Sequence, residues 1–127
     1  MNVCVITDDK MIQIDGEALN FDFTIDSNIH AIEWNGSTGN VQFKDGTANE
    51  ELTAITAYQS LIDAHANEKS RLAQAATDAE AALTYADRRK TKYDALSQFE
   101  MQYDDAKNST TTWVAAIDAI KVEFPKP

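Results

Sequence analysis

The stretch that decides the fold is residues 28–46, which read NIHAIEWNGSTGNVQFKDG. Apolar and polar side chains alternate twice in it, on either side of a glycine-containing loop at residues 35–39. A period of two is typical of strands that bury only one face. Glycine and asparagine tolerate the positive φ of tight turns, so the loop suits a hairpin. The stretch predicts two antiparallel strands whose shared apolar face carries Ile32, Trp34, Val41 and Phe43.

The same alternation extends back to the N-terminus. Turn residues stand where it stops, for example at Asp15-Gly16 and Asp45-Gly46. Residues 1–46 therefore predict a small antiparallel β meander with one wet side. The expected strands cover about residues 2–7, 10–15, 18–25, 29–35 and 40–44.

The remainder of the chain has a different composition. All four glycines lie within the first 46 residues and both prolines lie at positions 125 and 127, so nothing punctuates the backbone between them. Thr47 and Glu50 have the spacing of a capping box, which predicts a helix start. Residues 47–107 predict one long alanine-rich helix, and residues 108–127 a short C-terminal helical segment and tail. The predicted fold class is α+β.

The long helix raises a packing problem. Its first turns carry an apolar stripe, Leu52, Ile55, Tyr58 and Ile62, which we expect to lie on the sheet. Beyond His65 the stripe narrows to a near-heptad seam filled largely by alanine, which buries little area. Such a helix needs a second copy of the chain, a different protein, or its own C-terminal segment folded back at the polar residues 108–112.

Charge and cysteine content restrict the function classes. The formal net charge is −10 and the sequence pI is near 4.4, so nucleic acid and anionic membranes are not expected partners, whereas a basic protein surface would be attracted. Cys4 is the only cysteine, which rules out an intrachain disulfide and favours a cytosolic location. No signal-peptide pattern or apolar run of membrane-spanning length is present in the sequence.

No catalytic signature is apparent. The sequence lacks a glycine-rich phosphate loop, a paired Cys and His metal pattern and a nucleophile elbow, so we expect neither an enzyme nor a bound cofactor or metal. His30, His65 and Cys4 stand on separate predicted elements, which favours structural roles over a shared site. A hard-cation site is a weaker alternative to turn and wet-face roles for four acidic residues, Asp8, Asp9, Asp22 and Asp26.

Two groups of side chains remain on the predicted helix. A basic cluster, Arg88, Arg89, Lys90 and Lys92, alternates with Asp87 and Asp94, which favours a solvated, ion-paired face over a phosphate-binding patch. An aromatic series fits either a local helical-hairpin core or an intermolecular contact, namely Tyr85, Tyr93, Phe99, Tyr103 and Trp113. The residues expected to bind a partner are Leu72, Leu83, Tyr93, Leu96, Phe99, Trp113 and Ile117.

One resemblance gives these features a context. The strand Asn-Ile-His-Ala-Ile-Glu-Trp at 28–34, the following strand that ends in Asp45-Gly46, and Glu51-Leu52 before an alanine-rich helix resemble small proteins encoded among the tail genes of tailed bacteriophages. These are described as tail-fibre assembly proteins or chaperones. The resemblance covers residues 1–62 and is best at 28–52.

The resemblance implies a chaperone that binds and shields the fibre protein through its helical region, in the host cytoplasm. It also leaves open a structural tail or fibre-associated component that stays in the virion tail and is oligomeric through the helix. The implied partner is a tail-fibre or other tail protein, or a second copy of the chain.

Overall fold

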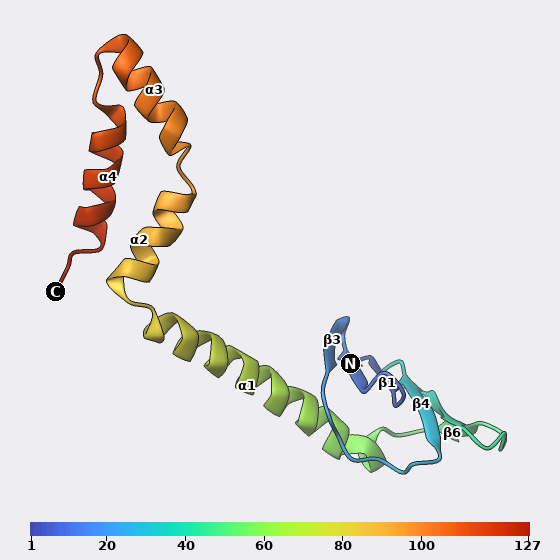
Figure 1. Cartoon of the computed structure of the whole chain (residues 1–127). Helices are drawn as coiled ribbons and strands as arrows, with labels where there is room; N and C mark the ends of the chain where they lie inside the picture. The colour runs from blue at the N-terminus through green and yellow to red at the C-terminus, as the bar shows by residue number, and fades with distance from the viewer. The chain divides into compact units, whose positions relative to one another are not determined.

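The computed structural model describes all residues, 1–127, and divides into two compact units. Unit 1 is Met1–Ala75 and unit 2 is Ala76–Pro127. Unit 1 contains a six-stranded antiparallel sheet, a 3-10 turn and the start of the long helix α1, Gln59–Ala82. Unit 2 contains the end of α1 and three shorter helices (Figure 1). The predicted α+β class is confirmed, with a long helix and a short C-terminal helix.

The sheet contains one strand more than predicted, in an order that a simple meander would not give. Neighbouring strands follow the order β3-β2-β1-β4-β5-β6, so β1 pairs with both β2 and β4 at the centre. The β3 strand ends at Asn20, where the prediction continued to residue 25. The strands are β1 Val3–Ile6, β2 Met11–Ile14, β3 Glu17–Asn20, β4 Ile29–Trp34, β5 Gly39–Phe43 and β6 Glu50–Leu52.

Residues 21–26 leave the sheet because their apolar side chains are used to cover it. Phe21, Phe23 and Ile25 alternate with exposed residues and are half-buried against the core. The rings of Phe21 and Phe23 pack edge to face with their centroids 5.7 Å apart. The alternation at residues 21–25 therefore predicted correctly that the segment has one apolar side, but this segment contributes to the core without joining the strand ladder.

The core of unit 1 lies on one face of the sheet. Val5 pairs with Ile32 across β1 and β4, and Ile32 pairs with Val41 across β4 and β5; all three are fully buried. Leu61 of α1 packs into the same cluster, together with half-buried Tyr58 and Ile62. The predicted two-strand platform under the first turns of the helix is confirmed.

The predicted helix start at Thr47 is wrong. Glu50–Leu52 form the edge strand β6 and pair with β5, with Leu52 opposite Gly39. A helix at this point would leave the β5 edge unpaired, and it would not place Leu52 in the core, where the side chain is 7% exposed. The helical region begins instead with the 3-10 turn η1, Thr56–Tyr58, which leads into α1.

The predicted continuous helix over 47–107 is also interrupted twice. A capping box does exist, but at Thr84 and Asp87, where it ends the run of α1 and starts α2, Tyr85–Asp94. Residues 95–97 then separate α2 from α3, Gln98–Asn108. Side-chain oxygens that satisfy backbone N–H groups make a new helix start locally favourable even in a strongly helical composition.

The C-terminal segment folds back, as the hairpin alternative predicted. Helix α4, Thr112–Glu123, packs against both α3 and α2 within unit 2 (Figure 1). The chain reverses at Ser109, which adopts the left-handed conformation with φ of 57°. None of the helices is both long enough and apolar enough to cross a membrane.

Candidate functional site

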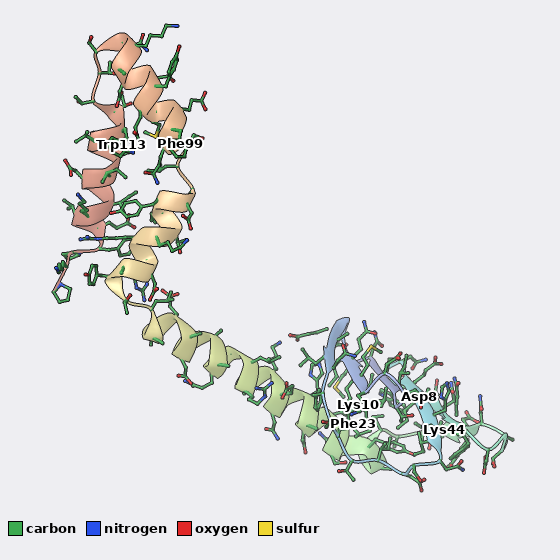
Figure 2. All side chains as sticks on the ribbon, in the orientation of Figure 1. Asp8, Lys10, Phe23, Lys44, Phe99 and Trp113 are labelled. Carbon is green, nitrogen blue, oxygen red and sulfur yellow. The ribbon has the colours of Figure 1, made fainter.

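The residues predicted to bind a partner fall into three groups in the structure. Leu72 on α1 and Leu83 just after it are exposed, at 43% and 42%. Tyr93, Leu96, Trp113 and Ile117 are half-buried in unit 2. Phe99 on α3 is 90% exposed (Figure 2). Leu72 belongs to unit 1 and the other six to unit 2, where four are half-buried and only Leu83 and Phe99 are exposed.

Trp113 belongs to the interior of unit 2. Its indole Nε1–H donates to Gln98 Oε1 at 3.3 Å, and Gln98 Nε2 donates to the carbonyl oxygen of Tyr93 at 3.1 Å. This chain of hydrogen bonds connects α4, α3 and α2. For Tyr93 and Trp113, the local-core reading of the aromatic series therefore describes the contacts better than an intermolecular one.

The turn between α3 and α4 is organised by one carboxylate. Asp105 Oδ1 accepts hydrogen bonds from the hydroxyls of Thr110 and Thr112, both at 2.6 Å. Its Oδ2 accepts from the backbone N–H of Trp113 at 2.7 Å, at the start of α4. These donors favour the charged form and hold the pKa of Asp105 well below its ordinary value. A negative charge at this helix end is also favoured by the helix dipole.

The basic cluster on α2 is fully engaged. Arg88 pairs with Glu80, Lys90 with Asp94, and Lys92 with Glu123. Arg89 Nε donates to the carbonyl oxygen of Phe124 at 2.8 Å, at the C-terminal end of α4, and its guanidinium lies over the ring of Tyr85. The prediction of an ion-paired face is confirmed, and Arg89 in addition ties α2 to α4.

Four large apolar side chains are exposed on α3 and α4. Phe99 and Tyr103 lie one turn apart on α3 with exposed fractions of 90% and 64%. Val114 and Val122 on α4 are exposed at 48% and 81%. We call these four residues the apolar surface of unit 2. The two valines were absent from the predicted set; their spacing of eight on one helix face was the available signal.

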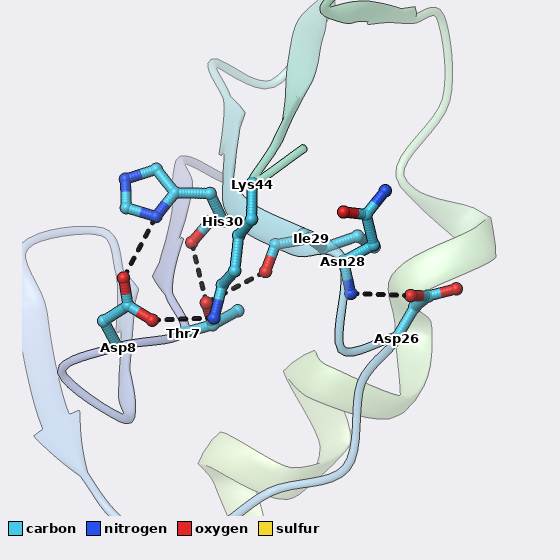
Figure 3. A network of polar contacts seen from close by, with 7 residues as sticks. All are labelled: Thr7, Asp8, Asp26, Asn28, Ile29, His30 and Lys44. Atoms are coloured by element: carbon cyan, nitrogen blue, oxygen red, sulfur yellow. Dashed lines mark hydrogen bonds and ion pairs between the residues drawn. The ribbon is translucent and has the colours of Figure 1, made fainter. Parts of the chain in front are cut away.

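Three of the four acidic residues considered for a cation site, Asp8, Asp22 and Asp26, serve turns and the exposed surface of unit 1. Asp8 accepts from Lys44 Nζ at 2.7 Å and lies 3.3 Å from His30 Nδ1, and the hydrogen bond from Lys44 lowers the pKa of Asp8 (Figure 3). Asp26 accepts from the backbone N–H of Asn28 at 2.8 Å. Asp22 pairs with Lys10. These contacts agree with the turn and wet-face reading.

The two histidines and the cysteine do not meet. His30 on β4 lies beside the carboxylate of Asp8, whereas His65 is buried on α1 with its Nε2 3.0 Å from the carbonyl oxygen of Glu17. Cys4 lies half-buried on β1, where burial and the carboxylate of Glu33 raise the pKa of its thiol. Nowhere do three His, Cys, Asp or Glu side chains come together as a group able to hold a metal ion.

Comparison with known proteins adds no neighbour. No protein-family model, no curated protein and no solved structure matches this chain.

Proposed function

We propose that this chain is a phage tail-fibre assembly chaperone that binds and shields the fibre protein through its helical region, with unit 2 as the binding part. The sequence resemblance over residues 1–62 supports this proposal for the N-terminal part of the chain. The observation that carries it is the apolar surface of unit 2. This surface and the resemblance come from different parts of the chain, so they support the proposal independently.

Unit 2 has little interior of its own. Ile120 is its only buried apolar residue, at 8% exposure, while Phe99 and Val122 are among the most exposed large apolar side chains of the whole chain. Fully burying a side chain of the size of Phe99 gains about 1.5–3 kcal/mol. A second polypeptide that covers the apolar surface would thus gain binding energy from contacts that the unit does not make by itself.

The arrangement fits shielding of an unassembled protein better than a catalytic role. Exposed aromatic and β-branched side chains on neighbouring helices offer area for packing without a fixed chemical group at the centre. Three basic residues of α2 are engaged in ion pairs within the chain, whereas the side chains of the apolar surface remain open to a partner. The proposed partner is the fibre protein of the same phage.

The test is co-expression of that fibre protein with and without this chain. We expect soluble fibre trimers with the wild-type chain and aggregated fibre without it. The double variant Phe99→Ser/Tyr103→Ser should lose this effect but keep the thermal midpoint of unit 2, because both side chains are already exposed. A matched control on the same helix, Gln102→Ser/Asp104→Ser, should behave as wild type.

Two results would count against the proposal. Fibre protein that trimerises normally in the absence of this chain would refute a chaperone role. A stoichiometric amount of the chain in purified particles, measured by mass spectrometry, would favour the alternative of a structural tail component.

A further inference from the structure

The second face of the sheet in unit 1 carries a row of polar side chains. The core residues all lie on the other face, under η1, α1 and residues 21–26. Strand register places one residue from each of five strands side by side on the second face. Cys4 of β1 is opposite Gln13 on one side and Glu33 on the other. Glu33 is in turn opposite Asn40, and Asn40 is opposite Glu51. We call this the polar row: Gln13, Cys4, Glu33, Asn40 and Glu51.

The polar row forms the floor of a hollow of about 690 Å³. The turns at this end of the sheet complete its walls with Asn2, Asp15, Asn35 and Thr38. Adjacent strands lie about 4.8 Å apart, so the row runs for roughly 19 Å across the sheet. That length suits an extended peptide segment better than a compact small molecule.

The charge of the hollow has one sign. Three carboxylates line it, those of Asp15, Glu33 and Glu51, and no lysine, arginine or histidine does. Glu33 has one polar contact, a 3.4 Å hydrogen bond from Asn40 Nδ2, and Glu51 has none. Unit 1 as a whole is also acidic, since it contains twelve acidic residues, these three included, and only four basic ones. Asp15 accepts a hydrogen bond from the backbone N–H of Asn2 at 2.7 Å, and the amino group of Met1 lies close to Gly36 in the neighbouring turn. A cationic group entering the hollow would still meet three carboxylates that form no ion pair with a side chain.

We propose that the polar row is a docking surface for an extended, arginine- or lysine-bearing segment of a partner protein. Amide groups of Gln13 and Asn40 provide donors and acceptors for the main chain of such a segment, between the carboxylates that would take its basic side chains. A side-chain cation fits better than a metal ion, because the three carboxylates of the hollow do not come together as a group able to hold a metal ion. This surface lies in unit 1 and does not depend on the proposed role of unit 2.

The test uses the full-length, ¹⁵N-labelled chain and a synthetic decapeptide of alternating arginine and serine. We expect amide shifts at Cys4, Glu33, Asn40 and Glu51, with binding that weakens as salt rises. The double variant Glu33→Gln/Glu51→Gln should weaken binding about three- to tenfold, the range expected for two partly exposed ion pairs. A peptide with citrulline in place of arginine, which keeps the shape and removes the charge, should not bind.

A control separates this surface from general attraction to an acidic protein. Asp9→Asn/Asp104→Asn removes the same charge from two exposed residues whose side chains make no hydrogen bond or ion pair. It should bind the arginine peptide like wild type. Equal weakening in both double variants, shifts confined to residues outside the polar row, or no binding of the peptide at millimolar concentration would each overturn the proposal. Because both variants keep Phe99 and Tyr103, failure here leaves the fibre test unaffected.

Discussion

Gly39 is the position where a single added methyl group should do most damage. It opens β5, faces Leu52 of β6 and pairs with Trp34 of β4. A Cβ at this position would lie 2.1 Å from the carbonyl oxygen of Glu33 and 3.0 Å from Trp34 Cα. Both neighbours are backbone atoms of the central strand β4, so neither can move aside as a flexible side chain would.

The size of the effect follows from these distances. Ordinary contact begins at 3.4 Å, so β4 and β5 must separate by more than one ångström at this point. Forcing extra volume into a packed region costs about 1–3 kcal/mol, and here part of the strand ladder is lost as well. For a unit of this size each kcal/mol lowers the melting temperature by about 4–8 °C, so Gly39→Ala should lower the midpoint of unit 1 by roughly 5–20 °C.

The assay exploits the two tryptophans, since Trp34 lies in unit 1 and Trp113 in unit 2. In a Trp113→Phe background, fluorescence during heating reports unit 1 alone. The control is Gly16→Ala, where a Cβ meets open space and the only cost is a positive φ of 90°. If Gly39→Ala were no more destabilising than Gly16→Ala, the close approach of β4 and β5 would be refuted.

Two further predictions concern unit 2. Asp105→Asn should lower its thermal midpoint, followed by Trp113 fluorescence, whereas the neighbouring Asp104→Asn should not. The folded-state pKa of Asp105 lies below its ordinary 3.8, so the contribution of this carboxylate to the free energy of unfolding is complete above that pH and is lost as the pH falls further. Wild type should therefore lose stability below about pH 4 more steeply than Asp105→Asn. Parallel acid curves for the two proteins would contradict the role of this carboxylate. Arg89→Gln should lower the free energy of unfolding of unit 2, measured in urea, by about 1–2 kcal/mol, because it breaks the half-buried hydrogen bond to the carbonyl oxygen of Phe124 at the end of α4. Lys90→Gln on the same helix should lower it by about 0.5 kcal/mol or less, because its ion pair is exposed. Similar losses in the two variants would show that the link from α2 to α4 is weak.

The first five strands could be predicted because alternation fixes both the strand and its buried side. Ile32 and Val41 face each other in the core as their spacing around the loop indicates. The strand order could not be predicted in the same way. Phe21 and Phe23 alternate with polar residues whether their segment continues the sheet, as a simple meander requires, or leaves the sheet and covers its core, as it does here. Helix-forming residues at 47–52 likewise gave no sign that the free edge of β5 would take Glu50–Leu52 as a strand.

In the helical region, the ion pairs of the basic residues and the fold-back of the C-terminal segment could be predicted, but the breaks before α2 and α3 could not. Three of the four basic residues of α2 form ion pairs as predicted, and Arg89 donates instead to the carbonyl oxygen of Phe124. The half-burial of Tyr93 and Trp113 could not be predicted, because it depends on where the chain reverses, and Asp105 holds that turn through its contacts with Thr110 and Thr112. Val114 and Val122 were not among the predicted residues, because a spacing of eight between two valines is a weak signal by itself.

The surroundings of Cys4 have a practical consequence for labelling. Its raised pKa keeps the thiol protonated at neutral pH, and only the thiolate reacts rapidly with maleimides or iodoacetamide. A second cysteine introduced at an exposed position such as Gln102 would therefore be modified first. Fluorophores or spin probes can be attached selectively to α3 without removing the native cysteine from the centre of the sheet.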